Sequence, residues 1–423
     1  MRIFAFNSFY TFIVKTLFMK QILKTFIDKS IVISLIFICF SIFLPPFFKS
    51  LSLTILILLI ILTYSTKSHS LKENVYFDNS LLLLFFYLLH IVGVLYSTDK
   101  NEAFFDLQVK LPLLLFPLVF MFIPKNILNK KYVWIAFVSI IIGLLVFIIF
   151  RFGIGINFAI QNKLPIFPQI SYVNLTGQPS YFALIAAISL IITYKAPLVK
   201  LFNLKPFINY ILKYTAFLII TIFFLFLNST SGIFLITMAY VYIITDALFV
   251  EKNKSFAIIS LLFIIAFYTL VFNLDAFNNR YKYYANVELK AEKNTGSQRK
   301  FVDLNAHKII LQSSVFGAGT GDVKSTLNKF YIDNDADFGK YYNAHNQFLQ
   351  TTIALGLVGL IILILVFLIP MIIMIKQKEY FLFMIFCLIG FSFLFESMLE
   401  KSMGTFFFGL IYVLSNSYLK KTL

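Results

Sequence analysis

The stretch from Asn343 to Leu360, NAHNQFLQTTIALGLVGL, joins a polar part of the chain to an apolar one. Residues 274–345 before it are rich in charged and polar types, whereas the sequence after it is almost entirely apolar. No other polar segment of this chain is as long, and His345 stands where it meets the apolar run. His345 is therefore the first candidate for a reactive side chain.

The composition is that of a membrane protein. Of the 423 residues, 60% are hydrophobic, 54 are phenylalanine and only 13% are charged, whereas soluble domains are about 45–50% apolar and about 25% charged. The net charge of +17 would suggest a nucleic-acid partner for a soluble protein. Here membrane topology explains most of it, so no nucleic acid is expected. Cys39 and Cys387 lie inside apolar runs and are expected to be core or lipid-facing residues rather than a disulfide.

Twelve apolar segments approach the length of about 20 residues that a membrane-spanning helix needs. The predicted fold is therefore an all-α polytopic membrane protein with about 12 transmembrane helices and one large, partly helical periplasmic loop. The lysine-rich residues 1–30 are expected to be an amphipathic cytoplasmic lead-in, not a signal peptide. The segments are 30–48, 51–66, 79–96, 111–124, 132–152, 178–195, 209–227, 230–249, 256–273, 346–375, 379–396 and 402–418.

Basic residues alternate between the connections. Acids offset much of the base in 97–110, 153–177, 274–345 and 397–401, whereas the other connections are short and basic. By the positive-inside rule both termini are cytoplasmic, and 274–345 faces the periplasm of a cell with two membranes. This predicts a multi-pass inner-membrane protein with about nine spans in 1–273, the loop 274–345, and about three spans in 346–423. The basic connections carry Lys67, Lys72, Lys125, Lys130, Lys131, Lys195, Lys200, Lys205, Lys252, Lys254, Lys376, Lys378, Lys420 and Lys421.

The long loop contains one helical pattern and one glycine cluster. Residues 297–313 have helical spacing and are expected to lie on the membrane surface or to pack beneath the loop. The cluster Gly317-x-Gly319-x-Gly321 lacks the Gly-Lys-Ser/Thr ending and the preceding strand of a phosphate loop, so a turn is predicted. One side of the predicted helix is formed by Phe301, Leu304, Lys308 and Leu311.

His345 has two interpretations. It can cap the start of the tenth span and bond locally. Alternatively, Asn343 and Asn346 flank a neutral imidazole at the outer membrane boundary, where it can accept a proton from a sugar hydroxyl. Helix N-terminal amides beneath it would help to orient an anionic substrate.

Two basic residues are candidates for binding a diphosphate. Arg299 precedes the predicted loop helix and is either solvated, with its head near lipid phosphates, or a fork for diphosphate. Lys110 ends the 97–110 connection and is either an interface lysine or a charge that faces a lipid-diphosphate cavity.

Glu396 and Glu400 are spaced one helical turn apart at the outer end of the eleventh span. Paired carboxylates can act as acid and base, or they can hold Lys and Arg groups in place, and the second role is favoured here. No Cys/His cluster has metal-ligand spacing, so no metal site is predicted.

At these residues the chain resembles the O-antigen ligase and O-antigen polymerase superfamily of bacterial membrane glycosyltransferases. The resemblance covers most of the chain in architecture, and 295–361 most clearly in motifs. Arg299 matches an arginine before the loop helix, and 314–321 matches a glycine-rich turn. Residues 395–400, with Gly404 and 406–408, are similar to the ending seen in Bacteroidetes-type members. A His-Asn-x-x-Leu-Gln … Leu-Gly-Leu-x-Gly signature is matched by His345, Asn346, Leu349, Gln350, Leu355, Gly356, Leu357 and Gly359.

The resemblance implies a glycosyltransferase that works outside the cytoplasmic membrane, inverting, without metal or cofactor. Its donor would be a glycan on undecaprenyl diphosphate, and membrane lipids would surround both substrates. His345 would take the proton of the acceptor hydroxyl, and Arg299 would stabilise the departing diphosphate. Gly319, Asn346 and Gln347, in the two matching segments, are further candidates for substrate binding, together with Glu396 and Glu400.

The sequence departs from the family at one point. Many members carry Ser-Arg-Gly at the start of a central span, where this chain reads Ser229-Thr230-Ser231-Gly232 without an arginine. If that arginine grips the lipid diphosphate, another base must replace it, and Lys110 and Arg280 are the candidates.

Three functions remain in view. A ligase would use lipid A–core as acceptor, and it is favoured here. An O-antigen or capsule polymerase would use a second lipid-linked repeat. A flippase or transporter would show mid-bilayer charges and a two-half repeat, neither of which the sequence shows clearly.

Overall fold

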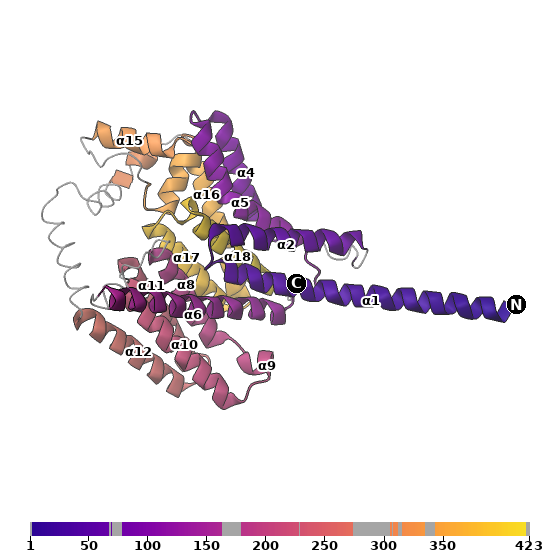
Figure 1. Ribbon diagram of the computed structural model, residues 1–423. Helices are drawn as coiled ribbons and strands as arrows, with labels where there is room; N and C mark the ends of the chain where they lie inside the picture. Colours follow the sequence, from indigo (N-terminus) through magenta and orange to yellow (C-terminus); the bar gives the residue numbers. More distant parts are fainter. Residues whose placement is uncertain are drawn as a thin grey trace.

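The computed structural model describes residues 2–66, 69, 78–162, 179–227, 229–273, 305–306, 308–311, 315–334 and 343–419 (Figure 1). Within these ranges the regular structure is helical and there is no strand. The helices are α1 (Arg2–Ser41), α2 (Pro46–Ser65), α4 (Leu81–Tyr96), α5 (Lys100–Met121), α6 (Lys130–Gln161), α8 (Pro179–Lys195), α9 (Leu198–Phe202), α10 (Pro206–Leu227), α11 (Thr230–Phe249), α12 (Lys254–Asn273), α15 (Val323–Asp333), α16 (Gln347–Lys376), α17 (Tyr380–Phe395), the 3-10 helix η1 (Met398–Glu400) and α18 (Ser402–Leu419).

Each of the twelve predicted apolar segments overlaps one of these helices, although 30–48 also includes the non-helical residues 42–45 and the start of α2. By length and composition, seven helices in the described ranges can cross a membrane, namely α2, α5, α6, α10, α11, α12 and α16. Helices α4, α8 and α17 are apolar but shorter. The prediction of an all-α polytopic membrane protein is confirmed, whereas the count of twelve spans and the three-part division stay predictions.

Three predicted boundaries are wrong. The lead-in 1–30 and the first span form one continuous helix, α1. Helix α6 continues to Gln161, beyond the predicted end of its span. Helix α5 begins at Lys100, so most of the predicted 97–110 connection is helical. The cause of the last error is Asp99, whose side chain caps α5 by accepting the N–H of Glu102 at 3.0 Å.

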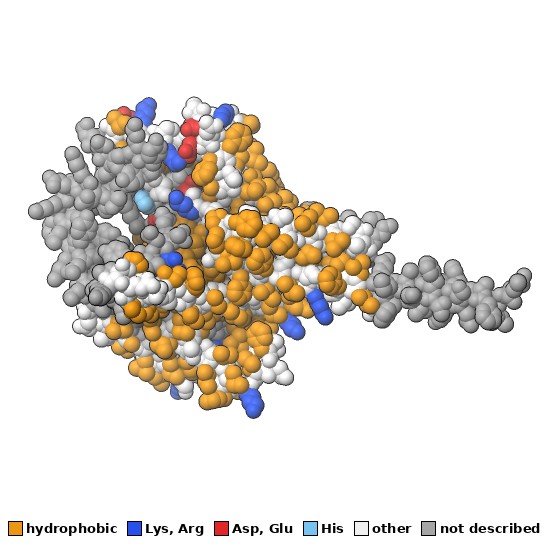
Figure 2. Space-filling model, viewed as in Figure 1, with side chains coloured by type: hydrophobic (Ala, Val, Ile, Leu, Met, Phe, Trp, Pro, Cys, Tyr) orange, Lys and Arg blue, Asp and Glu red, His pale blue; other side chains and the backbone are white. Residues whose placement is uncertain are grey.

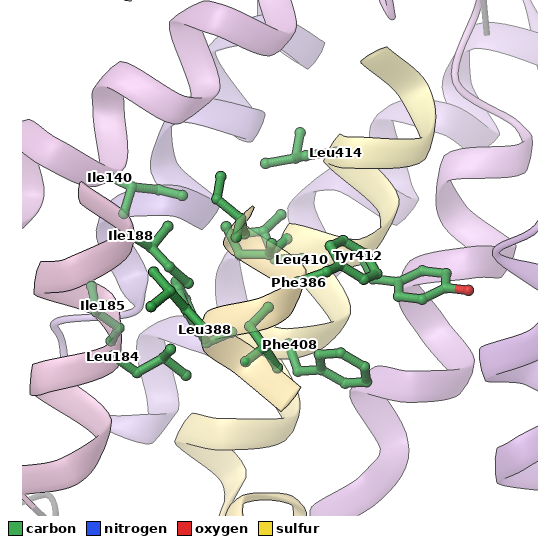
Figure 3. Close-up of a cluster of buried hydrophobic side chains, with 14 of the residues drawn as sticks. Ile140, Leu184, Ile185, Ile188, Phe386, Leu388, Phe408, Leu410, Tyr412 and Leu414 are labelled. Atoms are coloured by element: carbon green, nitrogen blue, oxygen red, sulfur yellow. The ribbon is translucent and has the colours of Figure 1, made fainter. Parts of the chain in front are cut away.

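The core lies where α6, α8, α17 and α18 pack together (Figure 3). In α8 every residue from Tyr181 to Tyr194 is buried, and α18 is buried from Gly404 to Leu419. A helix that is apolar on all sides is expected to be surrounded by other helices. Ile140 of α6, Ile188 of α8 and Leu410 of α18 meet in this cluster.

The helix ends that the charge pattern places on one side do meet one another. Lys130 at the start of α6 pairs with Glu379, which precedes α17, at 3.0 Å. Lys195 at the end of α8 pairs with Asp246 of α11 at 2.6 Å and with Glu251 just beyond α11 at 2.7 Å. On the face shown in Figure 2, apolar side chains cover the helical flank and acidic ones gather where α4, α5 and α15 lie.

Helix α16 is broken at Gly356, whose φ is 65° and ψ −159°. The break frees two carbonyl groups, and the turn around Gly317 fills the gap. Ala318 N–H donates to the Ile353 carbonyl at 2.8 Å, and Gly319 N–H donates to the Ala354 carbonyl at 3.0 Å. A Cβ on Gly317, where φ is +76°, would lie 2.5 Å from the Gly356 nitrogen. The predicted turn is therefore confirmed, and glycine is needed there for close backbone approach.

The same turn is docked on the corner between α4 and α5 (Figure 1). Thr320 donates its hydroxyl to the His90 carbonyl at 2.7 Å, and Gly321 N–H donates to the Ser97 hydroxyl at 3.0 Å. The Asp322 carboxylate accepts the N–H of Thr98 at 2.6 Å and that of Asp99 at 3.0 Å. The segment that leads to α15 is thus held between α16 and the α4–α5 corner.

Asp322 is ionised in this arrangement. Burial alone would raise the pKa of Asp322, but the N–H groups of Asp99 and Thr98 and the Thr98 hydroxyl outweigh it and hold the pKa below its usual value. Because the folded pKa is the lower one, this carboxylate stabilises the fold above the unfolded pKa, and its contribution is lost as the pH falls through the folded pKa.

Gly317→Ala is expected to lower the thermal unfolding midpoint of the purified protein in detergent. A non-glycine residue held at this φ costs about 1–3 kcal/mol, and its methyl group would also clash with Gly356 and Ala354. Gly153→Ala is the control, since nothing lies within 4 Å of a Cβ there and alanine is favoured over glycine in a helix by up to about 1 kcal/mol. Equal midpoints for the two variants would show that the turn is not inserted at the break.

Asp322→Asn is expected to lower the unfolding midpoint at pH 7 and to flatten its fall toward acid pH. The asparagine side chain carries no negative charge, so its hydrogen bonds from the N–H groups of Thr98 and Asp99 are weaker. The measurement is the midpoint as a function of pH from neutral to acid. Asp333→Asn, the same chemical change on an exposed residue of α15, should leave the profile unchanged. A profile of Asp322→Asn parallel to the wild type would contradict the assignment.

Candidate functional site

His345 lies directly before α16, and its imidazole is left out of the helix cap. The cap is Asn346, whose side-chain oxygen accepts the N–H of Leu349 at 3.1 Å. His345 itself has a φ of 49°, and its N–H donates to the Asn343 side chain at 3.1 Å. A non-glycine residue in this left-handed region points to a local constraint. The interpretation of His345 as the cap of this helix is therefore wrong.

The imidazole of His345 faces the carboxylate of Glu396. His345 Nδ1 lies 3.6 Å from Glu396 Oε2, and the two side chains are 28% and 13% exposed. The separation is too long for a hydrogen bond but within ion-pair range. A carboxylate beside Nδ1 favours a proton on that nitrogen, which leaves Nε2 able to accept one. The pair is thus arranged as a base with an orienting carboxylate, in the manner of a general-base site.

Glu396 and Glu400 do not form a pair of carboxylates on a helix turn, as their spacing had suggested. Helix α17 ends at Phe395, Glu396 has extended backbone, and Glu400 lies in η1. Lys110 of α5 donates to Glu400 Oε1 at 3.0 Å and also to Asp106. Burial would raise the pKa of Glu400, but the ammonium group of Lys110 outweighs it and the pKa is lowered. Glu400 therefore holds a basic group in place.

Residues 396–401, here called the 396–401 corner, are tied to α16 and α8. Gln347 is 1% exposed, and its side-chain oxygen accepts the N–H of Leu399 at 2.7 Å. Tyr181 of α8 donates its hydroxyl to the Met398 carbonyl at 3.2 Å. These bonds fix the backbone between Glu396 and Glu400 against the start of α16.

Four further predicted site residues are described, and their contacts lie within the protein. Asn346 and Gln347 use their side-chain oxygens in bonds within the protein, and Gly319 lies in the turn inserted at the break of α16. Lys110 is 1% exposed and bound by two carboxylates. Arg299 and Arg280 lie outside the described residues, as does most of the predicted loop helix 297–313. Of the described part of that helix, Ile309 is buried, whereas Leu311, expected on the same face as Lys308, is 81% exposed.

A groove of about 1140 Å³ adjoins the 396–401 corner. Its walls are mostly apolar side chains from α1, α2, α6 and α8. Three basic residues, Lys49, Arg151 and Lys401, line it, and no acidic residue does among those that the structure describes. Tyr181 and Lys401 belong both to the groove wall and to the surroundings of the corner. An apolar channel with cations and no anion suits a ligand with an apolar chain and an anionic head.

Several of these residues were not predicted from the sequence. Asp106 and Lys110 are spaced i,i+4, which brings them together only if both lie in one helix. The signal for that helix is Asp99-x-x-Glu102, a capping signature at its start. Lys49, Arg151 and Lys401 are far apart in the sequence, and each alone resembles an interface cation. No local pattern would have joined them.

Comparison with known proteins supports the resemblance for part of the chain. A comparison with curated proteins found no relative. Residues 215–364 match a family model described as O-antigen ligase. This stretch begins in α10, contains the glycine turn and His345, and ends in α16 beyond its break. This match and the motifs around His345 support a likeness to the O-antigen ligase superfamily over residues 215–364.

Proposed function

We propose that this protein is an O-antigen ligase-like glycosyltransferase of the inner membrane. It moves a glycan from undecaprenyl diphosphate to a hydroxyl of lipid A–core at the periplasmic face, and both of its termini are cytoplasmic. The observation that carries the proposal is the His345–Glu396 pair, because it shares the 396–401 corner with a cationic, apolar groove. A base thus stands next to a space suited to a lipid-linked anion.

His345 acts as the general base in this proposal. The acceptor oxygen attacks the anomeric carbon, its proton passes to His345 Nε2, and the bond to the diphosphate breaks with its electron pair going to the leaving group. A single displacement inverts the anomeric centre. Glu396 orients the ring through Nδ1 and stabilises the imidazolium that forms. Diphosphate is a good leaving group, so cations that neutralise it can be sufficient.

The donor lies in the groove. Its polyprenyl chain packs against the apolar walls, and its diphosphate meets Arg151, Lys401 and Lys49. These residues supply the charge that many family members obtain from an arginine near Ser231-Gly232. Arg299 and Arg280 remain candidates for the same head group. Lys110 is the less suitable candidate, because both of its described partners are protein carboxylates.

A polymerase of O-antigen or capsule is the alternative, with a second lipid-linked repeat as acceptor. The groove and the base would serve either reaction, so the acceptor decides between them. A flippase or transporter needs no base at the membrane edge, and the His345–Glu396 pair has no role in it.

His345→Ala is expected to abolish complementation of a ligase-deficient strain of a related bacterium, judged by lipopolysaccharide ladders. The loss of a general base slows transfer by about 100- to 10,000-fold. Glu396→Gln should slow it by about 10- to 100-fold, since a carboxylate at ion-pair distance stabilises the imidazolium by on the order of 1.5–3 kcal/mol. His69→Ala, which removes a histidine paired with Asp28, is the control and should complement.

Each outcome of this experiment has a defined meaning. Full ladders with stably expressed His345→Ala would exclude His345 as the base. If the wild type fails here but restores chain length in a polymerase-deficient strain, the acceptor is a second lipid-linked repeat. Failure in both strains, with the protein present in the membrane, would contradict both glycosyltransferase assignments.

Arg151→Gln is expected to raise KM for the lipid-linked donor by about 10- to 100-fold, because one charged contact to the diphosphate is lost. The measurement is transfer by purified protein at varied donor concentration, with binding of undecaprenyl diphosphate as a second readout. Lys254→Gln removes an exposed cation at the start of α12 and serves as control. An unchanged KM and unchanged binding for Arg151→Gln would place the diphosphate elsewhere.

A further inference from the structure

Three charged side chains, one of them from the 396–401 corner, form a buried cluster. Lys110 of α5 is 1% exposed, and its ammonium group binds Asp106 on the same helix and Glu400 of the corner. The side chains of Asp106 and Glu400 are 14% and 19% exposed. Charges removed from water carry a large desolvation cost and persist only when they are well paired. Such a cluster inside an otherwise apolar bundle calls for a reason beyond packing.

The cluster fixes the part of the chain that carries Glu396. Glu400 is bound by Lys110 from α5 and by Gln347 from the start of α16. Gln347 in turn accepts the N–H of Leu399, and Thr405 of α18 donates its hydroxyl to the Val109 carbonyl at 2.7 Å. Three residues separate Glu400 from Glu396, whose carboxylate lies 3.6 Å from His345. Displacement of Glu400 would therefore move Glu396 relative to His345.

We propose that Asp106, Lys110 and Glu400 are positioning residues that hold Glu396 beside His345. The ammonium group of Lys110 is the link between a rigid membrane helix and the irregular corner, and Asp106 keeps it aimed at Glu400. This inference rests on the proposed function for its catalytic consequence, whereas its structural part can be tested without activity. None of the three residues lines the groove, so they act through Glu396 and not on the donor.

The position of the corner is measured with a cysteine pair. His345→Cys and Glu396→Cys are combined in a full-length chain in which Cys39 and Cys387 are replaced by alanine. A short thiol cross-linker should join the pair when Lys110 is present. Adding Lys110→Met should remove most of the cross-link, because two carboxylates then face each other without a cation. Glu379→Ala is the matched control, since it breaks a 3.0 Å Lys–Glu pair beside the other end of α17, and it should leave the cross-link unchanged.

The catalytic consequence is measured without the added cysteines. Lys110→Met should lower kcat by about 100-fold, the cost of a misplacement near 1 Å in a reacting constellation, and leave KM for the donor unchanged. Glu400→Gln, which still accepts a hydrogen bond, should give a smaller loss of kcat and is the variant to use if Lys110→Met does not fold. A rise in KM with unchanged kcat would overturn the proposal and make Lys110 a donor-binding residue.

A triple variant separates positioning from simple folding support. Asp106→Asn, Lys110→Met and Glu400→Gln together remove every charge of the cluster, so no unpaired charge stays buried and the fold should be retained. The proposal expects kcat and the cross-link to remain low. Recovery of kcat and of the cross-link would show that the three charges only neutralise one another and do not position Glu396. If the cross-link responds as expected but the wild type transfers no glycan, the positioning role stands and the proposed function fails.

Discussion

The arrangement of the chain around His345 depends on backbone hydrogen bonds between a glycine turn and a broken helix. Gly356 interrupts α16, and the N–H groups of Ala318 and Gly319 satisfy the carbonyls that the break frees. Unsatisfied backbone groups are costly in a membrane and are tolerated only where protein re-satisfies them. The break and the turn therefore need each other, and together they set where the first turns of α16 and His345 lie.

The approximate positions of the long apolar helices could be predicted because they depend on apolar length, whereas the shorter helices α9 and α15 were not predicted. All twelve predicted segments became helices. The start of α5 was missed because charged residues between Asp99 and Lys110 were interpreted as a connection, whereas Asp99 caps a helix whose Asp106 and Lys110 neutralise each other. A charge inside a helix can be tolerated when an opposite charge lies one turn away. Mean hydropathy counts both residues as polar and does not take their pairing into account.

The site was only partly predictable, for a similar reason. His345 could be found because it stands at a polar–apolar junction, which is a local feature. The different contacts of Glu396 and Glu400 depend on backbone geometry. Because α17 ends at Phe395, the two glutamates do not lie on one helix, and they contact different partners, His345 and Lys110. The groove cations come from α2, α6 and the corner, and tertiary packing alone brings them together.

The two carboxylates also differ in what they can contribute to a reaction. Glu400 is neutralised by Lys110, so its charge is already used, whereas the described partner of Glu396 is the imidazole of His345. In the proposed reaction, a proton gained by His345 would strengthen its attraction to Glu396, and the groove cations would neutralise the leaving group. His90 contacts both the glycine turn and the charged cluster. Its carbonyl accepts the hydroxyl of Thr320, and its ring lies 3.7 Å from Asp106. Rigid backbone bonds and buried charge thus hold His345 and Glu396 together, which is the arrangement that the proposed transfer from a diphosphate requires.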